Sequence, residues 1–190
     1  MKKEGANVKQ IIIYKSRTGF TKQYAQWLAQ SLKCDCIPQE DAGGVRLSDY
    51  DVIIFGSSFR AGNIEEIKWY KETVLPFDKI NVVFVTGALP QNSPEAVRAV
   101  EQNFSRKERQ KIRTFYLQSG LNYEAMNLGD KLLMKVFRGM LKGRKPHTEE
   151  ERSFLELMQK SFDIQSRKIW NRCSIIFRDC RNNRIAGVTL

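Results

Sequence analysis

The chain has 190 residues, of which 42% are hydrophobic, and this is enough for one domain with a buried core. No apolar run approaches the ~18 residues of a membrane span, and the polar N-terminus lacks the apolar core of a secretion signal. We therefore expect a cytoplasmic protein without a transmembrane helix. The formal net charge of +11 favours anionic partners, namely nucleic acid, anionic lipid or acidic ligands.

The first informative stretch, Gln10 to Lys22, predicts a strand, a hydroxyl-rich loop and a helix. The strand at Ile11–Ile13 has no alternating polar face, as expected of a central strand that is buried on both sides. The helix that follows has an apolar face at Tyr24, Trp27, Leu28 and Leu32. Between them lie six candidate ligand-binding residues: Ser16, Arg17, Thr18, Gly19, Phe20 and Thr21.

This loop has the composition of a phosphate-binding site. Ser16, Thr18 and Thr21 supply hydroxyl groups, Gly19 allows close backbone approach, and the first helical turn presents unpaired N–H groups to an anion. Arg17 adds positive charge. The loop lacks both the Gly-Lys-Ser/Thr ending and the three spaced glycines of the two commoner phosphate motifs. An ordinary hydroxyl-rich turn is the alternative interpretation.

The chain then alternates between strand and helix patterns, which is typical of a parallel sheet with helices on both faces. Further strands are predicted at 33–37, 51–56, 80–86 and 113–119, and helices at 64–75 and 93–104. The expected fold is an α/β three-layer sandwich whose five-stranded parallel sheet has the order 2-1-3-4-5. In that order the winding reverses between the first and third strands, so their loops should meet at a ligand site.

An insertion at 120–147 is expected after the fifth strand, followed by a final helix at 148–162. Its second half, 130–145, carries six Lys/Arg and one acid among apolar residues. This pattern predicts a basic amphipathic helix on an anionic membrane surface. Alternatively, the helix packs on the sheet through four apolar residues: Leu133, Phe137, Met140 and Leu141. The domain spans 1–162, and no pattern places the tail at 163–190.

The chain has four cysteines in two separated pairs: Cys34, Cys36, Cys173 and Cys180. Their spacing matches no zinc site, so we expect reduced, partly buried thiols and no metal. The single histidine, His147, follows Pro146 and has no evident carboxylate partner. We therefore predict that it is a loop residue and not a catalytic base.

Three features together resemble a known family: the loop at 16–21, the segment at 56–62, and Leu121–Tyr123 ahead of the basic stretch at 130–141. They are similar to the flavodoxin-like, menaquinone-dependent protoporphyrinogen IX dehydrogenases of bacteria and related flavodoxin-domain proteins, over about 9–162. The resemblance implies a flavodoxin-like fold that holds FMN with its phosphate on 16–21. The ring would lie between two loops whose candidate residues are Ser57, Ser58, Phe59, Arg60, Ala61, Gly62, Asn63, Thr86, Gly87, Ala88 and Leu89.

The resemblance further implies an FMN-dependent oxidoreductase that passes electrons from a tetrapyrrole-like substrate to a quinone, peripherally on the inner face of the membrane. No catalytic residue is assigned, because the chemistry would be the flavin's. Arg60 would stabilise an anionic reduced flavin or bind a carboxylate, with a surface salt bridge as the alternative. Phe59 or Tyr123 would supply aromatic cover for the ring.

Two other function classes stay open. One is a flavodoxin-type electron carrier or docking module without turnover of its own, although flavodoxins that act as mobile carriers are acidic as a family. The other is a flavin-free module that binds membrane or nucleic acid. Basic clusters at 106–113 and 131–145 permit it, but no stacking aromatics are interleaved with them, so nucleic acid is not the expected partner.

Overall fold

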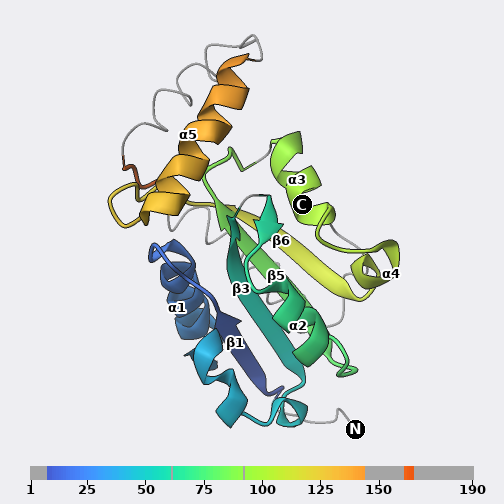
Figure 1. The fold of residues 1–190 in the computed structure, drawn as a ribbon. Coiled ribbons are helices and arrows are strands. Elements are labelled where there is room, and N and C mark those ends of the chain that lie inside the picture. The colour runs from blue at the N-terminus through green and yellow to red at the C-terminus, as the bar shows by residue number, and fades with distance from the viewer. Residues whose placement is uncertain (1–7, 61, 92, 144–160, 165–190) are drawn as a thin grey trace, which may run out of the picture.

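The computed structural model describes residues 8–60, 62–91, 93–143 and 161–164 (Figure 1). Parallel strands form the central sheet in the order β2-β1-β3-β5-β6, and a short β4 pairs antiparallel with the end of β3. This is the predicted order 2-1-3-4-5, with β4 as an addition. The strands are β1 (Gln10–Tyr14), β2 (Asp35–Pro38), β3 (Val52–Arg60), β4 (Asn63–Ile64), β5 (Ile80–Gly87) and β6 (Ile112–Gln118).

Helices cover both faces of the sheet and make the predicted three layers (Figure 1). Helix α1 (Phe20–Leu32) lies on one face and buries Tyr24 and Leu28. Helices α2 (Ile67–Thr73), α3 (Pro94–Glu101) and α4 (Arg106–Arg109) lie toward the other. Two 3₁₀ helices, η1 (Gln39–Gly44) and η2 (Leu47–Asp49), connect β2 to β3. The sheet therefore separates two hydrophobic cores.

Strand β1 is buried on both sides, as its sequence predicts. Ile11 and Ile13 belong to the core under α2 and α3, whereas Ile12 belongs to the core under α1, and all three are 0% exposed. Each such side chain contributes about 1.5–3 kcal/mol by leaving water. The strand that leads into the loop at 16–21 is thus held firmly from both faces.

The predicted loop at 56–63 is instead a β-hairpin. Strand β3 continues past Gly56 because Ser57 and Ser58 still pair with β5. The chain then turns back, and Arg60 pairs with Asn63. Helix α2 consequently begins at Ile67, later than the predicted 64, since Ile64 belongs to β4 and Glu66 has a left-handed φ of 57°. These bounds correct the expectation, and they make this part of the site a rigid element.

The start of α3 is as predicted. The Ser93 hydroxyl accepts a hydrogen bond from the Ala96 N–H at 3.1 Å, and Pro94 occupies the first helical turn. Helix α4 was not predicted. It begins with a capping box in which Ser105 and Glu108 each accept a hydrogen bond from the other's backbone N–H.

The insertion contains helix α5 (Leu128–Gly143), close to the predicted basic amphipathic helix. It projects beyond the end of the sheet at which the β1–α1 loop lies (Figure 1). Most of the expected final helix at 148–162 lies outside the described residues. Phe162, however, forms an antiparallel bridge with Leu121, with both N–H···O distances at 2.8 Å, and is therefore not helical. The tail is described only at 163 and 164.

Cys34 and Cys36 flank Asp35 at the start of β2 and are free thiols. Burial is the main reason why the pKa of Cys34 is raised to about 12, and the nearby Cys36 and Asp35 add to this shift. Burial also raises the pKa of Cys36 to about 11. Both thiols are thus protonated and unreactive at neutral pH. Cys173, Cys180 and His147 lie outside the described residues.

Within the described ranges, no three or more His, Cys, Asp or Glu side chains gather in a way that suits a metal ion. No helix in those ranges is both long and apolar enough to cross a membrane.

Candidate functional site

The candidate site lies where the winding of the sheet reverses. β1 and β3 lie side by side in the sheet. The other neighbour of β1 is β2, and the other neighbour of β3 is β5. The two segments that leave the carboxyl ends of β1 and β3 therefore run in opposite directions, and ligands of such sheets bind at this reversal point. The Lys15 N–H donates to the Gly56 carbonyl at 2.8 Å, which brings the two predicted loops together as expected.

The β1–α1 loop presents the amino end of α1 without a cap. Gly19 is the N-cap residue and has a left-handed φ of 94°, which disfavours any residue with a Cβ. Gly19 itself has no side chain that could cap the helix, and no side-chain cap bond is made at this position among the described residues. The positive end of the helix dipole points at the loop, and an anion there gains about 0.3–1 kcal/mol from it.

Ser16 supplies a second, independent sign of a ligand. Its Oγ is buried, yet it has no hydrogen-bond partner in the part of the chain that the structure describes, where the Arg113 guanidinium is the other such case. An unsatisfied buried hydroxyl costs about 1–3 kcal/mol, so it is retained where it has another role. A phosphate oxygen in the loop would satisfy it.

Thr21 and Thr86, both predicted to contact the cofactor, are bonded to each other in the structure. Their hydroxyl oxygens are 2.8 Å apart, both side chains are buried, and Thr86 also approaches the Ser57 carbonyl at 3.4 Å. These bonds join the loop to β5 and β3. Thr21 and Thr86 therefore connect the loop to the sheet, whereas Thr18 of the same loop is partly exposed.

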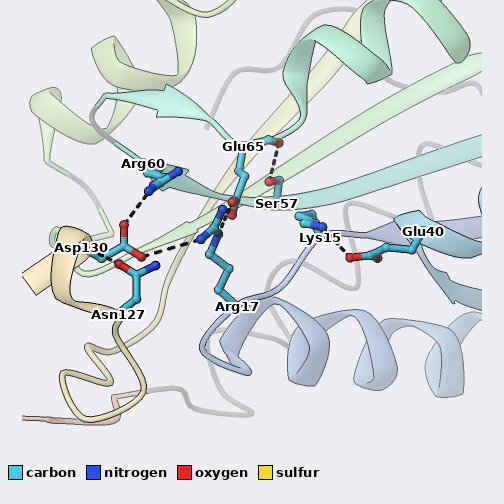
Figure 2. Close-up of polar contacts among 8 residues, drawn as sticks. All are labelled: Lys15, Arg17, Glu40, Ser57, Arg60, Glu65, Asn127 and Asp130. Carbon is cyan, nitrogen blue, oxygen red and sulfur yellow. Dashed lines mark hydrogen bonds and ion pairs between the residues drawn. The ribbon is translucent and has the colours of Figure 1, made fainter.

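Arg17 belongs to a charge cluster of four residues: Arg17, Arg60, Glu65 and Asp130. Figure 2 shows its guanidinium reaching up from the loop between Glu65 of the hairpin and Asp130 of α5. Arg17 Nε donates to Glu65, and its Nη1 is 3.8 Å from Asp130 Oδ2. Arg60 Nε donates to Asp130 Oδ1 at 2.9 Å. The cluster connects the loop, the hairpin and the insertion.

The two acids of this cluster were not assigned a role from the sequence. Glu65 is only 8% exposed, and its backbone is fixed because its N–H donates to Ser58 and its carbonyl accepts from Ser57 at 2.7 Å. The hydrogen bond to Glu65 is the main cause of the raised pKa of Arg17. Asp130 lies in the first turn of α5, where its N–H donates to Asn127 Oδ1 at 2.8 Å.

The third predicted segment, after β5, is folded against the end of β6. The Ser119 N–H donates to the Gly87 carbonyl at 2.8 Å, and the Tyr116 hydroxyl donates to the Leu89 carbonyl at 3.0 Å. The Gln118 N–H donates to Gln91 Oε1 at 2.7 Å. This segment, including Ala88, is thereby fixed beside the hairpin without a ligand.

The aromatic residues expected near the ring have other contacts. Phe59 packs against the core beneath the hairpin, with its ring centroid 6.3 Å from that of Tyr116. Lys131 Nζ lies 5.6 Å from the centre of the Tyr123 ring, and Phe20 is close to the carboxyl end of β6 at Gly120.

The turn of the hairpin is supported by a residue that the sequence did not reveal. Asn103 accepts a hydrogen bond from the Ile64 N–H at 2.9 Å and donates to the Gly62 carbonyl at 3.2 Å. Asn63 is exposed at the same turn, and Ala61 lies outside the described residues. An asparagine at a helix end is an ordinary surface residue in a sequence pattern, so its role depends on the folded chain.

An open parallel sheet, a helix end with a glycine N-cap and a buried hydroxyl without a partner among the described residues lie together at the reversal point, and they are features expected of a site for a phosphate-bearing ligand. The model of the flavodoxin domain family matches residues 11–148. The chain belongs to this family, and membership implies a flavin cofactor. The predicted phosphate loop at 16–21 fits that group, because it offers the Ser16 and Thr18 hydroxyls beside the amino end of α1.

Two solved structures were found to be similar to the chain. One is a candidate flavoprotein from Bacteroides eggerthii, with 14% identity over 68% of this chain and 98% of that one, at a TM-score of 0.41. The other is a flavodoxin from the domain Archaea, with 18% identity over 68% of this chain and 99% of that one, at a TM-score of 0.39. No curated protein matches the sequence.

Proposed function

We propose that this protein binds FMN and acts as an FMN-dependent oxidoreductase. The observation that carries the proposal is the buried, unpartnered Ser16 Oγ beside the uncapped amino end of α1, in a chain of the flavodoxin domain family. Ser16, Thr18 and the N–H groups around Gly19 would hold the phosphate. The hairpin at 57–63 and the segment at 86–89 would border the ring.

FMN would supply the redox chemistry, and the protein would supply binding, orientation and electrostatics. The charge of Arg60 at the hairpin would favour an anionic reduced cofactor or a substrate carboxylate beside it. A tetrapyrrole-like electron donor and a quinone acceptor, as the sequence resemblance implies, would place the reaction beside a membrane.

A titration of the purified protein with FMN tests the first part of this proposal. Bound flavin should lose fluorescence and shift its visible absorption, and riboflavin, which lacks the phosphate, should bind far more weakly. If FMN and riboflavin bind equally, the phosphate cradle is not the determinant. Quinone-dependent oxidation of a reduced tetrapyrrole by the FMN-loaded protein then tests the substrate class, and flavin reduction without turnover would favour an electron carrier.

Helix α5 supports the membrane part of the proposal. Leu128, Leu132 and Val136 recur every four residues, so they share one helix face, and their side chains are 85%, 64% and 54% exposed. Lys131 and Lys135 flank this stripe. The alternative prediction was that α5 packs on the sheet through 133, 137, 140 and 141. The Leu133 side chain is 36% exposed, which does not fit that packing, and the side chains at 137, 140 and 141 are not among those that the structure describes. A basic face around exposed leucines suits an anionic lipid surface.

We predict that the protein sediments with vesicles rich in phosphatidylserine and that Leu132→Ser with Val136→Ser weakens this binding about ten-fold or more, because apolar burial drives insertion. Phe77→Ser is the matched control, since Phe77 is an exposed apolar residue outside α5 and should leave vesicle binding unchanged. Equal binding to phosphatidylcholine vesicles, or loss of binding in the control alone, would refute α5 as an anionic-lipid contact.

A further inference from the structure

Asp130 lies between two arginines that come from separate parts of the fold (Figure 2). Its Oδ1 is 2.9 Å from Arg60 Nε, and its Oδ2 is 3.8 Å from Arg17 Nη1. The side chain of Asp130 is 17% exposed, whereas those of Arg17 and Arg60 are 42% and 49% exposed. Two guanidinium groups that converge on one enclosed carboxylate have the form of a receptor for a carboxylate or phosphate.

The charges of the cluster balance only while Asp130 is present. Arg17 and Arg60 carry two positive charges, and Glu65 and Asp130 carry two negative ones. Glu65 is fixed in the hairpin by backbone bonds to Ser57 and Ser58. Asp130 comes from the insertion instead. If α5 moves away, the cluster keeps one net positive charge, and an external anion can replace the Asp130 carboxylate.

We propose that Arg17 and Arg60 form an anion-binding pair that Asp130 fills in the ligand-free protein, so that phosphate binding in the Ser16 loop and attachment of α5 oppose each other. A phosphate beside Ser16 competes with Asp130 for the Arg17 guanidinium and repels the Asp130 carboxylate. By linkage, release of α5 strengthens phosphate binding by the same factor. FMN binding would thereby free α5, with its exposed apolar stripe, for a partner surface.

Hydrogen exchange of α5 in the ligand-free protein tests the attachment itself, and this test does not depend on the proposed function. Asp130→Asn and Arg60→Gln should each raise exchange at 128–136 about two- to five-fold, the size expected of a part-exposed ion pair. The double variant should show no larger effect than either single one.

Asp130→Glu, which keeps the charge, should restore protection. Glu95→Gln is the matched control, because it breaks the exposed Glu95–Arg98 pair of α3 and should leave α5 unchanged. Additive effects of the two cluster variants, or none, would overturn the inference that Asp130 attaches α5 through Arg60.

The coupling itself rests on the proposed function and needs the ligand. Saturating FMN should raise α5 exchange in the parent protein about two- to five-fold and should have no effect in Asp130→Asn, which should bind FMN about two- to five-fold more tightly. Riboflavin should leave α5 exchange unchanged, because it lacks the phosphate.

Two outcomes would overturn the coupling: FMN that binds without changing α5 exchange, or FMN that binds more weakly to Asp130→Asn than to the parent protein. If FMN binds to no variant, the proposed function and the coupling both fail, while the attachment measured without ligand stands.

Discussion

The Ser16→Ala variant is expected to bind FMN about 10- to 100-fold more weakly than the parent protein and to unfold at the same temperature or higher. A hydrogen bond to a charged oxygen contributes about 1.5–3 kcal/mol, and the variant removes one from the ligand. In the free protein the same change removes a buried hydroxyl that has no partner, so it relieves a desolvation cost. Fluorescence titration with FMN and thermal unfolding of the ligand-free protein measure the two effects.

Two other serine variants serve as comparisons for the effects on stability and on FMN affinity. Ser57→Ala should lower the free energy of unfolding by about 1 kcal/mol, because the Ser57 hydroxyl donates to the Glu65 carbonyl at 2.7 Å. Ser105→Ala should cost a similar amount by removing the cap of α4 and should leave FMN affinity unchanged. If Ser16→Ala instead destabilises the protein and binds FMN normally, the Ser16 hydroxyl is structural and the phosphate site is elsewhere.

The Gly56→Ala variant is expected to lose about 2–3 kcal/mol of stability, or to fail to fold, because the Phe84 ring of β5 lies against Gly56 and occupies the place of a Cβ. A Cβ on Gly56 would lie 2.1 Å from Cζ of Phe84, which is fully buried and is its direct partner in the sheet. Overpacking of a buried site costs about 1–3 kcal/mol. Urea unfolding monitored by circular dichroism measures the loss, which corresponds to a fall of roughly 5–10 °C in the unfolding temperature.

Two comparisons make the cause specific. Gly43→Ala should be nearly neutral, since a Cβ there has no heavy atom within 4 Å. Phe84→Leu provides room for the new methyl group, so the double variant Gly56→Ala, Phe84→Leu should be more stable than the sum of the two single losses predicts. A neutral Gly56→Ala, or strictly additive losses, would mean that the ring moves aside at no cost and that Gly56 is present for another reason.

The sequence predicted the fold because its signals are local. An all-apolar run such as Ile11–Ile13 marks a doubly buried strand, the Ser93-Pro94 pair marks a helix start, and strict alternation of strands and helices favours a parallel sheet. The strand order 2-1-3-4-5 then followed from the arrangement that is common for five parallel strands with alternating helices. The same local logic correctly indicated that the insertion contains a basic helix, and it predicted a phosphate loop at 16–21, which stays a prediction.

The expectations that failed or changed depend on contacts between distant residues. The chain after Gly56 was predicted to be a loop, but pairing with Val85 and Thr86 of β5 extends the strand. The contact of Phe59 with Tyr116 of β6 was likewise not predicted, and its role as ring cover stays a prediction. The sequence at 57–60 does not show which of its side chains will be buried. That depends on pairing with strands that are more than 20 residues away in the chain.

The sequence by itself determined the α/β architecture and the position of a hydroxyl-rich loop at the sheet's reversal point, since periodicity and helix-start chemistry are properties of neighbouring residues. Only the tertiary structure decided that the Ser16 hydroxyl is left without a partner in the described part of the chain, and that Arg17 and Arg60 share Asp130. Arg17 and Glu65 are 48 residues apart in the chain, and Arg60 and Asp130 are 70 apart. Such pairs form when packing of the core brings separate elements together, and no local pattern records them.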